Sequence, residues 1–266
     1  MIDDSFKTIR ITRRGDGAAV LTLARPDVHN AFNEGMIAEM TAGLAALDRD
    51  PAVRLVILAA EGKSFSAGAD LDWMRRMATY SKAENLADAG RLAELMRALN
   101  GLAKPSIARV QGAAFGGGVG LVSCCDIAVA VEGARFALSE VSLGLIPAVI
   151  SPYVIAAIGA RAARRWFLTG ERFDADEAGR LGLIHRVVPP ADLDAAVEAI
   201  VALLLAGPPG AQAAAKELIF AVADRPQGPE VIADTARRIA ERRATAEGRE
   251  GVAAFLEKRA PNWGAV

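Results

Sequence analysis

The sequence predicts an α/β fold with a helical region at its C-terminal end. Between residues 9 and 131, apolar runs as long as buried strands alternate with segments whose apolar residues recur at helical spacing. The pattern breaks at Gly207-Pro208-Pro209-Gly210, and beyond it the chain is alanine-rich and helical in pattern up to Pro261. We therefore predict an α/β core over residues 1–206 and a helical region over residues 207–266.

The first elements form a crossover unit. Residues 9–11 and 19–23 flank the turn signal Arg14-Gly15-Asp16-Gly17, which predicts a β-hairpin. Residues 33–48 carry apolar side chains at helical spacing and end before a proline, which indicates a helix. Residues 54–60 contain an uninterrupted apolar run that is typical of a buried strand. The order strand, helix, strand predicts two parallel strands joined by a helix.

The same alternation continues through the middle of the chain. We predict a helix from about residue 86 to residue 99 and strands at residues 106–110 and 127–131. Between these strands the chain enters an apolar segment through Gly116-Gly117-Gly118 and Gly120. Glycine inside a helix or strand costs roughly 0.5–1 kcal/mol relative to alanine, so we expect some group to approach this backbone closely. Parallel strands joined by helices are the economical arrangement for this pattern.

Composition excludes several classes of protein. The 266 residues are 52% hydrophobic, which is enough for a sizeable core, and 31 basic residues nearly balance 32 acidic ones. No long run of one charge suggests nucleic acid or a membrane surface as a partner. The adjacent Cys124 and Cys125 fit neither a disulfide framework nor a metal site. Residues 1–17 lack an apolar targeting core, so we expect a cytoplasmic protein that starts near Met1 and has no membrane span.

Known nucleotide and hydrolase motifs do not fit. Gly62-Lys63-Ser64 follows a strand, but a phosphate-binding loop would need glycine at Ile57. The dinucleotide fingerprint fails at Leu121, where its last glycine belongs, and no nucleophile elbow is present. With only His29 and His185 in the chain, we expect no metal cluster or serine triad and interpret both histidines as surface or packing residues.

Two small-residue loops remain as candidates for a functional site. Residues 64–71 follow the strand that ends at Ala60, and residues 112–118 follow the strand that ends at Val110. Backbone N–H groups in such loops, with a helix N-terminus behind each, suit a carbonyl oxygen that becomes negative during a reaction. Either loop taken alone is more simply explained as a tight turn between packed elements.

Both loops belong to a longer series of motifs. These are Arg25-Pro26 with Asn30-Ala31, Phe65 to Asp70, Lys104-Pro105 with Gly112 to Gly118, Cys125-Asp126, Ser139-Glu140 through Gly144 to Pro147, and Ala254 to Arg259. In this order they resemble the crotonase (enoyl-CoA hydratase/isomerase) superfamily over nearly the whole chain. The resemblance implies a spiral of ββα and βαβ turns, followed by a helical C-terminal region that mediates trimers or dimers of trimers.

The resemblance also implies a site for an acyl-CoA thioester, with no metal and no separate cofactor. The N–H groups of Ala69 and Gly117 would form the oxyanion hole, and the glycine run would let the thioester lie against the backbone. Phe255 and Lys258 would complete the CoA site of a neighbouring subunit. The other implied contacts with the substrate or CoA are Arg25, Val28, Ala31, Ala67, Gly68, Asp70, Leu71 and Gly116.

One catalytic position departs from the family pattern. Hydratases of this family carry two glutamates, of which the second is present as Glu140, whereas Gly120 stands at the first. Apolar neighbours should raise the pKa of Glu140 towards neutrality, which suits proton transfer. Our first hypothesis is a hydratase that adds water across a 2,3 double bond. A double-bond isomerase with Glu140 as its single base is the alternative, and a non-catalytic CoA-ester-binding protein is a third possibility.

The surroundings of Gly120 add a finer resemblance. They are similar to a bacterial branch that acts on 3-methylglutaconyl-CoA and related carboxylated substrates, which would connect the protein with leucine or fatty acid breakdown. In that branch glycine at position 120 is not unusual. We expect the small residue at this position to enlarge the acyl pocket and to remove a charge that would repel an acidic acyl group.

Overall fold

The structure is a computed structural model that describes residues 2–3 and 6–263. Met1, the expected start, and the last three residues of the predicted helical region lie outside the described residues. Within the described chain, the strands form one sheet of seven strands and one of four. The larger sheet contains, in spatial order, β1 (Ile2–Asp3), β2 (Ile9–Arg13), β3 (Ala18–Leu23), β4 (Leu55–Ala60), β6 (Ser106–Val110), β8 (Ile127–Val131) and β11 (Arg186–Val188). The smaller contains β10 (Arg172–Asp174), β9 (Arg135–Ala137), β7 (Ala113–Phe115) and β5 (Ser64–Ser66).

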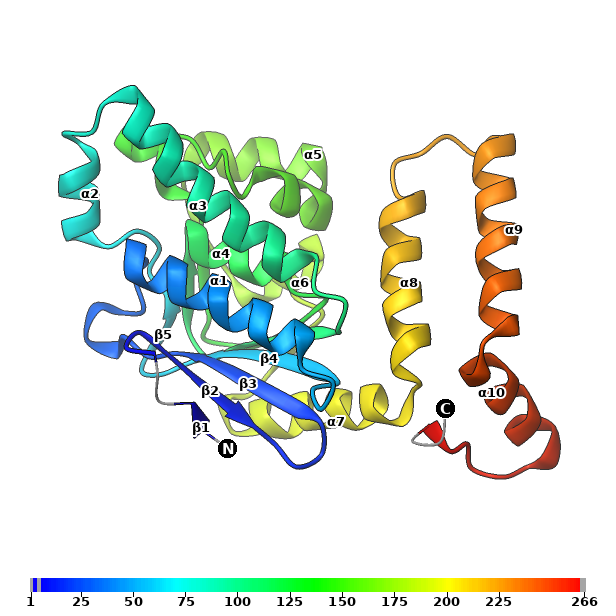
Figure 1. Cartoon of the computed structure of the whole chain (residues 1–266). Helices are drawn as coiled ribbons and strands as arrows, with labels where there is room; N and C mark the ends of the chain where they lie inside the picture. Colours follow the sequence, from blue (N-terminus) through cyan, green and yellow to red (C-terminus); the bar gives the residue numbers. More distant parts are fainter. Residues whose placement is uncertain (1, 4–5, 264–266) are drawn as a thin grey trace.

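The larger sheet confirms the elements predicted from periodicity. β2 and β3 are antiparallel, with Ile9 opposite Leu23, and β3 runs parallel to β4, with Ala18 opposite Leu55. β6 and β8 continue the sheet in parallel. All six residues of β4 are buried because helices cover one face of this central strand and the rest of the core covers the other (Figure 1). The predicted α/β class is therefore correct.

The smaller sheet was not predicted. β5 and β7 are three residues each, too short and too rich in small residues to show a period of two. They pair in parallel, with Ser64 opposite Ala113 and Ser66 opposite Ala114. Both candidate loops therefore contain a short strand, and the pairing brings the ends of the two loops side by side.

Helices surround the sheets and then leave them. α1 packs on α3, and α4 lies between α3 and α5 (Figure 1). The described helices are α1 (Glu34–Arg49), α2 (Leu71–Met77), α3 (Lys82–Asn100), α4 (Gly117–Cys124), α5 (Ser151–Thr169), α6 (Ala175–Leu181), α7 (Leu193–Ala206), α8 (Pro209–Val222), α9 (Pro229–Ala244) and α10 (Ala246–Glu257), with 3₁₀ turns η1 (Pro26–Val28), η2 (Ser139–Leu143) and η3 (Pro190–Asp192). None of these helices is long and apolar enough to cross a membrane.

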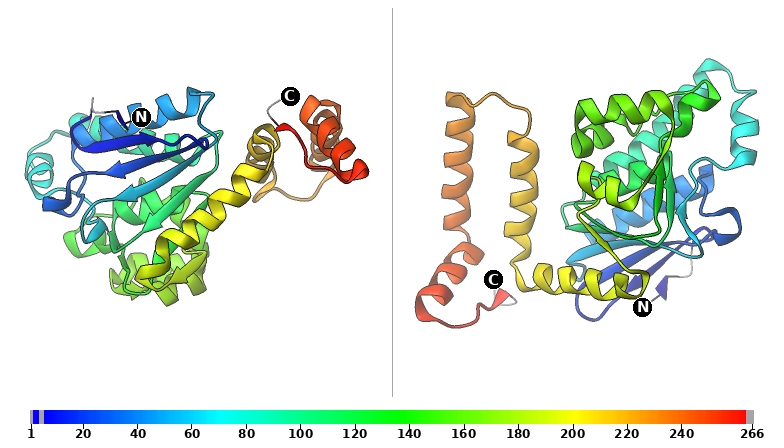
Figure 2. Two further views of the ribbon diagram at one scale, coloured as in Figure 1. Left: turned by 90° about the horizontal axis from the view of Figure 1, so that it is seen from below. Right: turned by 180° about the vertical axis from the view of Figure 1, so that it is seen from behind.

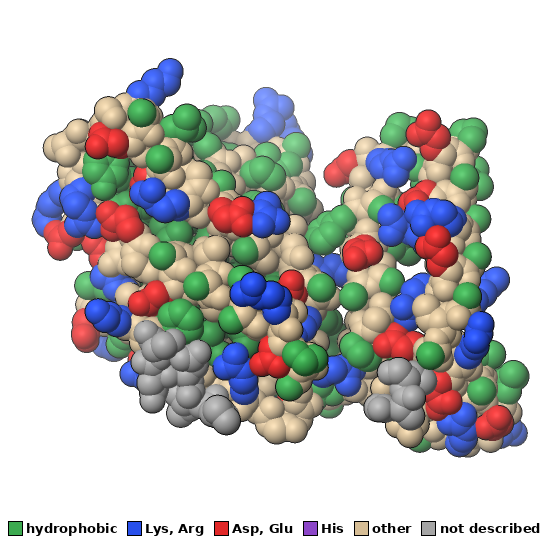
Figure 3. Space-filling view, in the orientation of Figure 1, with side chains coloured by type: hydrophobic (Ala, Val, Ile, Leu, Met, Phe, Trp, Pro, Cys, Tyr) green, Lys and Arg blue, Asp and Glu red, His purple; other side chains and the backbone are tan. Residues whose placement is uncertain are grey.

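The last three helices, α8 to α10, stand apart from the sheets, and we call them the arm. Figures 1 and 2 show them as a separate layer beside the core, reached through α7. Hydrophobic side chains lie between charged ones on the visible face of the arm (Figure 3). At the junction, the Lys216 ammonium group on α8 contacts the Asp126 carboxylate of the core at 2.9 Å.

Candidate active site

The glycine run forms the start of a buried helix. Gly116 is the N-cap of α4 and has φ of 50°, a left-handed conformation that favours glycine. A Cβ atom on Gly117 would lie 2.9 Å from the Phe32 ring, and one on Gly118 would lie 2.8 Å from the Ser66 carbonyl oxygen. The expected close approach is confirmed, but at these positions the approaching group is the protein itself. Packing within the chain already requires these glycines, in agreement with the simpler explanation of a tight turn between packed elements.

The first loop is fastened to the segment that follows β3. The buried Asn30 amide donates to the carbonyl oxygens of Glu61 at 2.8 Å and Ser64 at 2.9 Å. Its oxygen accepts from the Arg25 N–H at 2.9 Å, and the Arg25 guanidinium donates to the Asp70 carboxylate at 2.8 Å. Desolvation would raise the pKa of Asp70, but this bond and the N–H groups at the start of α2 outweigh it and lower that pKa. Asp70 thus holds the loop in place as a carboxylate.

The two N–H groups expected to polarise a carbonyl make no hydrogen bond with any residue that the structure describes. The Phe32 N–H donates to the Gly68 carbonyl at 2.6 Å, and the Asp70 N–H donates to the Phe32 carbonyl at 2.8 Å. Between these bonds, the Ala69 N–H finds no acceptor in the part of the chain that the structure describes, and neither does the Gly117 N–H. Because Gly117 begins α4, the partial positive charge of the helix N-terminus adds to its N–H.

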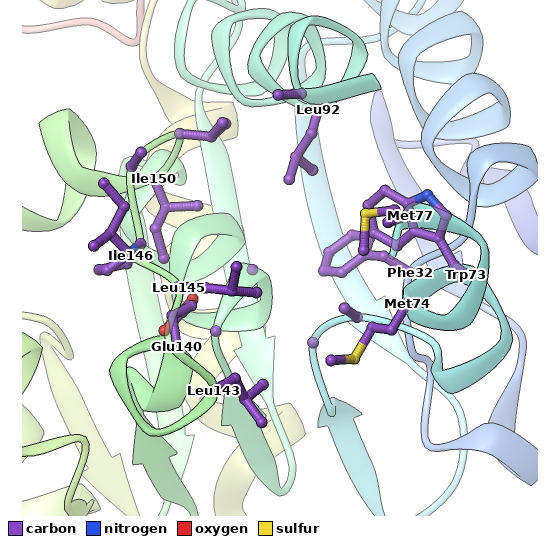
Figure 4. A pocket seen from close by; sticks show the side chains of 18 of the residues that line it. Phe32, Trp73, Met74, Met77, Leu92, Glu140, Leu143, Leu145, Ile146 and Ile150 are labelled. Carbon is purple, nitrogen blue, oxygen red and sulfur yellow. The ribbon is translucent and has the colours of Figure 1, made fainter. Parts of the chain in front are cut away.

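Ala69, Gly117 and Glu140 line one cavity of about 860 Å³. Figure 4 shows its two walls, with Glu140, Leu143, Leu145, Ile146 and Ile150 on one side and Phe32, Trp73, Met74 and Met77 on the other. Leu92 from α3 lies at the upper end of the same view. Asp88 also lines the cavity, and its buried carboxylate is paired with Arg91 at 2.6 Å. The space is therefore largely apolar, with carboxylates at two places.

Glu140 lies in η2, directly after β9. Its Oε2 atom is buried without a hydrogen-bond partner in the described chain, and its Oε1 atom lies 3.0 Å from where a Cβ of Gly116 would be. Desolvation raises the pKa of Glu140, as the sequence predicts. Any side chain at position 116 would displace this carboxylate, so Glu140 can occupy this position only because residue 116 is glycine.

At Gly120 the structure corrects an expectation. A Cβ atom there would lie 2.3 Å from Ile150 Cγ2 and 2.9 Å from Ile150 Cβ. The space given up by the missing glutamate is therefore filled by Ile150, and the predicted enlargement of the pocket is wrong. Sequence reasoning missed Ile150 because it lies 30 residues away and just before a helix, where periodicity gives no information about what it touches.

The remaining predicted contacts divide into two groups. Ala67, Gly68, Leu71 and Gly116 line the cavity, as expected for contacts with the substrate. The residues that do not line it in this chain are Arg25, Val28, Ala31, Asp70, Phe255 and Lys258. Arg25 and Asp70 instead join the segment that follows β3 to the loop that carries Ala69. Phe255 is 82% exposed on α10 of the arm, and Lys258 directly follows that helix.

The wall formed by α2 and α3 was not predicted. It contains Trp73, Met74, Met77, Asp88 and Leu92. The spacing of Trp73 and Met77 indicates one face of a helix, but only the packing of α2 and α3 beside the loops shows that this face borders a cavity.

Comparison with known proteins agrees with this geometry. The family model described as enoyl-CoA hydratase/isomerase matches residues 13–265. A crystal structure of an enoyl-CoA hydratase from Shewanella pealeana is 49% identical, with a TM-score of 0.95 over 98% of this chain and 97% of that one. Crotonyl-CoA hydratase from Syntrophomonas wolfei is 35% identical over 259 residues, 95% of this chain and 96% of the relative. Short-chain-enoyl-CoA hydratase from Clostridium acetobutylicum is 33% identical over 248 residues, 91% and 92% of the two chains. The chain therefore belongs to the enoyl-CoA hydratase/isomerase family of enzymes, within the crotonase superfamily.

Proposed function

We propose that the protein is an enoyl-CoA hydratase that adds water across the 2,3 double bond of an acyl-CoA thioester. One observation carries this proposal. Ala69 and Gly117, whose N–H groups have no acceptor among the described residues, line the same cavity as the half-buried, desolvated Glu140. The names of the relatives, which are hydratases, support the same reaction.

In the proposed reaction, Glu140 moves a proton twice. Its carboxylate accepts a proton from water while the water oxygen bonds to C3 of the substrate. The π electrons of the double bond shift towards the thioester oxygen, which the N–H groups of Ala69 and Gly117 stabilise. Glu140 then returns the proton to C2, and the carbonyl re-forms. One N–H of this kind contributes about 3–4 kcal/mol in a dry site, so both groups matter to the rate.

The acyl group is proposed to be branched or carboxylated, as in 3-methylglutaconyl-CoA. Support comes from the wall beside Glu140, where Ile150 stands in place of a second carboxylate and removes one source of repulsion for an acidic substrate. The mostly aliphatic lining of the cavity also suits a branched chain.

A panel of enoyl-CoA esters assayed by mass spectrometry tests the reaction and the substrate together. We expect products heavier by one water, and a faster reaction with 3-methylglutaconyl-CoA than with crotonyl-CoA. A tenfold preference for crotonyl-CoA would contradict the proposed acyl group while leaving hydration intact. No gain of water on any ester would contradict hydration itself.

The second candidate is a double-bond isomerase, because a single Glu140 is sufficient to shuttle one proton between carbons. The absence of a second carboxylate at Gly120 favours this alternative. Labelled water separates the two reactions, since only hydration places its oxygen-18 in the product. An ester whose mass is unchanged but whose double bond has moved would establish the isomerase.

We further propose that the chain self-associates as a trimer or a dimer of trimers. The arm supports this, since large apolar side chains stay exposed on it: Ile219 at 63%, Ile232 at 66%, Phe255 at 82% and Leu256 at 72%. In such an assembly Phe255 and Lys258 would reach the CoA site of a neighbouring subunit.

A further inference from the structure

Two glycines at the start of α4, its N-cap Gly116 and Gly120 within the helix, leave space for side chains that line the cavity. Gly116 and Gly120 are four residues apart, and the Gly120 N–H donates to the Gly116 carbonyl at 3.2 Å. The two glycines are therefore about one helical turn apart along the axis of α4. Glu140 covers the first glycine and Ile150 covers the second. Glu140 and Ile150 both line the cavity and lie on the same wall of it (Figure 4).

The position of Ile150 is fixed by packing. It is 3% exposed, and α4 and α5 pack closely where it lies, at the N-cap of α5. A side chain at position 120 would overlap it, because even a Cβ atom would lie 2.3 Å from its Cγ2. The wall beside the proton-transferring acid thus carries a rigid apolar group where the family pattern has a carboxylate.

We propose that Ile150 is a specificity-determining residue that contacts a substituent on C3 of the acyl group and so favours 3-branched enoyl thioesters. The inference rests on the proposed hydration. Glu140 must come within hydrogen-bond reach of the water that attacks C3. Ile150 lies on the same wall of the cavity as Glu140, and we place it beside C3 of the bound substrate. On binding, a methyl branch at C3 of the substrate leaves water and contacts the methyl groups of Ile150.

Two substrates that differ by one methyl group provide the test. 3-Methylcrotonyl-CoA carries the branch and crotonyl-CoA lacks it, and neither carries an acidic group. One methylene in an apolar pocket discriminates by roughly 10–200-fold in kcat/KM. We expect Ile150→Ala to lower the ratio of kcat/KM for the branched over the unbranched ester by about tenfold, at the lower end of that range. Ile150→Val, a milder change, should give an intermediate ratio.

The control is Ile155→Ala, the same substitution at a half-exposed position on α5 outside the cavity lining. It should leave the ratio unchanged. A change of less than twofold in Ile150→Ala, or an equal change in Ile155→Ala, would overturn the inference.

Saturated esters separate this inference from the proposed reaction. 3-Methylbutanoyl-CoA and butanoyl-CoA cannot be hydrated, so calorimetry of their binding measures the contact with Ile150 alone. A wild-type preference for the branched ester that falls about tenfold in Ile150→Ala supports the contact, even if no enoyl ester gains water. Equal affinities in both proteins would overturn it, even if hydration is established.

A thermal unfolding cycle tests the packing on which the argument depends. Gly120→Ala alone should lower Tm strongly because of the overlap with Ile150. Gly120→Ala combined with Ile150→Ala should recover part of that loss, since the closest overlapping atom is gone. Additive losses in the double variant would show that the two residues do not touch, and would overturn the inference.

Discussion

The core of this chain buries most of its large apolar side chains, whereas the arm leaves several of them exposed. In the core, residues such as Leu21, Met40 and Leu58 are fully buried between sheets and helices. On the arm, Ile232 on α9 is 66% exposed and Phe255 on α10 is 82% exposed, although both helices are well formed. The core thus buries such side chains within one chain, whereas those exposed on the arm form the surface that the proposed self-association would cover.

The two regions meet through a charged pair that is itself largely buried. Lys216 of α8 is 8% exposed and contacts Asp126, which also accepts hydrogen bonds from the backbone N–H and the hydroxyl of Ser106. Asp126 follows α4, the helix that begins with Gly117. The arm is thus fixed to the far end of the helix that forms part of the cavity, and variants can separate the two regions.

The largest effect should come from the core alone. Glu140→Gln removes the proton acceptor but keeps the shape of the side chain, so we expect kcat to fall by about 10²–10⁴-fold. Binding of a CoA ester, measured by calorimetry, should remain. Glu132→Gln makes the same substitution at an exposed site just after β8, and as the matched control it should keep full activity. Activity within twofold of wild type in Glu140→Gln would remove this residue from the reaction.

The pH dependence provides a second measurement on the same variant. Burial raises the pKa of Glu140. As the pH is lowered, Glu140 should therefore become protonated, and kcat/KM should fall, at a higher pH than for an ordinary glutamate. The folded state also holds this proton more tightly than the unfolded state, so ionisation opposes folding. Wild type should therefore lose stability relative to Glu140→Gln as pH rises through that pKa. An equal difference in stability at all pH values would contradict a perturbed Glu140.

An intermediate effect is expected from the arm. Phe255→Asp places a charge on its most exposed large apolar side chain, and burying a phenylalanine contributes about 1.5–3 kcal/mol. Sedimentation velocity should show self-association weakened by roughly 10–100-fold, which is the same range expressed as an equilibrium constant. Phe255→Leu should associate as wild type does. An unchanged oligomer in Phe255→Asp would show that α10 does not form the contact between subunits.

The smallest effect should come from the junction. Lys216→Met leaves Asp126 without its cation and should lower the free energy of unfolding by roughly 1–2 kcal/mol. This is less than for a fully buried pair, because the Asp126 side chain is 27% exposed. Urea unfolding measures this loss of free energy, and Lys82→Met, at an exposed position, is the control. Equal midpoints for the two variants would mean that the pair does not hold the arm to the core.

Much of the larger sheet and the main features of the site could be predicted from the sequence. Residues 106–110 and 127–131 are strands as predicted. Residues 127–131 form the continuous apolar run of a strand buried on both faces, whereas residues 106–110 also include Ser106 and Arg109. The predicted helix 33–48 appears as α1, with Asn33 as its N-cap. Ala69, Gly117 and Glu140 line one cavity, although only their motifs pointed to them.

What the sequence by itself determined is the set of periodic elements, the two small-residue loops and the single acid at position 140. The tertiary structure alone decided the smaller sheet, the wall formed by α2 and α3, and the pairing of Gly120 with Ile150. The physical reason is that a local pattern records whether a residue is buried, but not which distant side chain fills the space beside it. A glycine shows that space is needed, and only packing shows what occupies it.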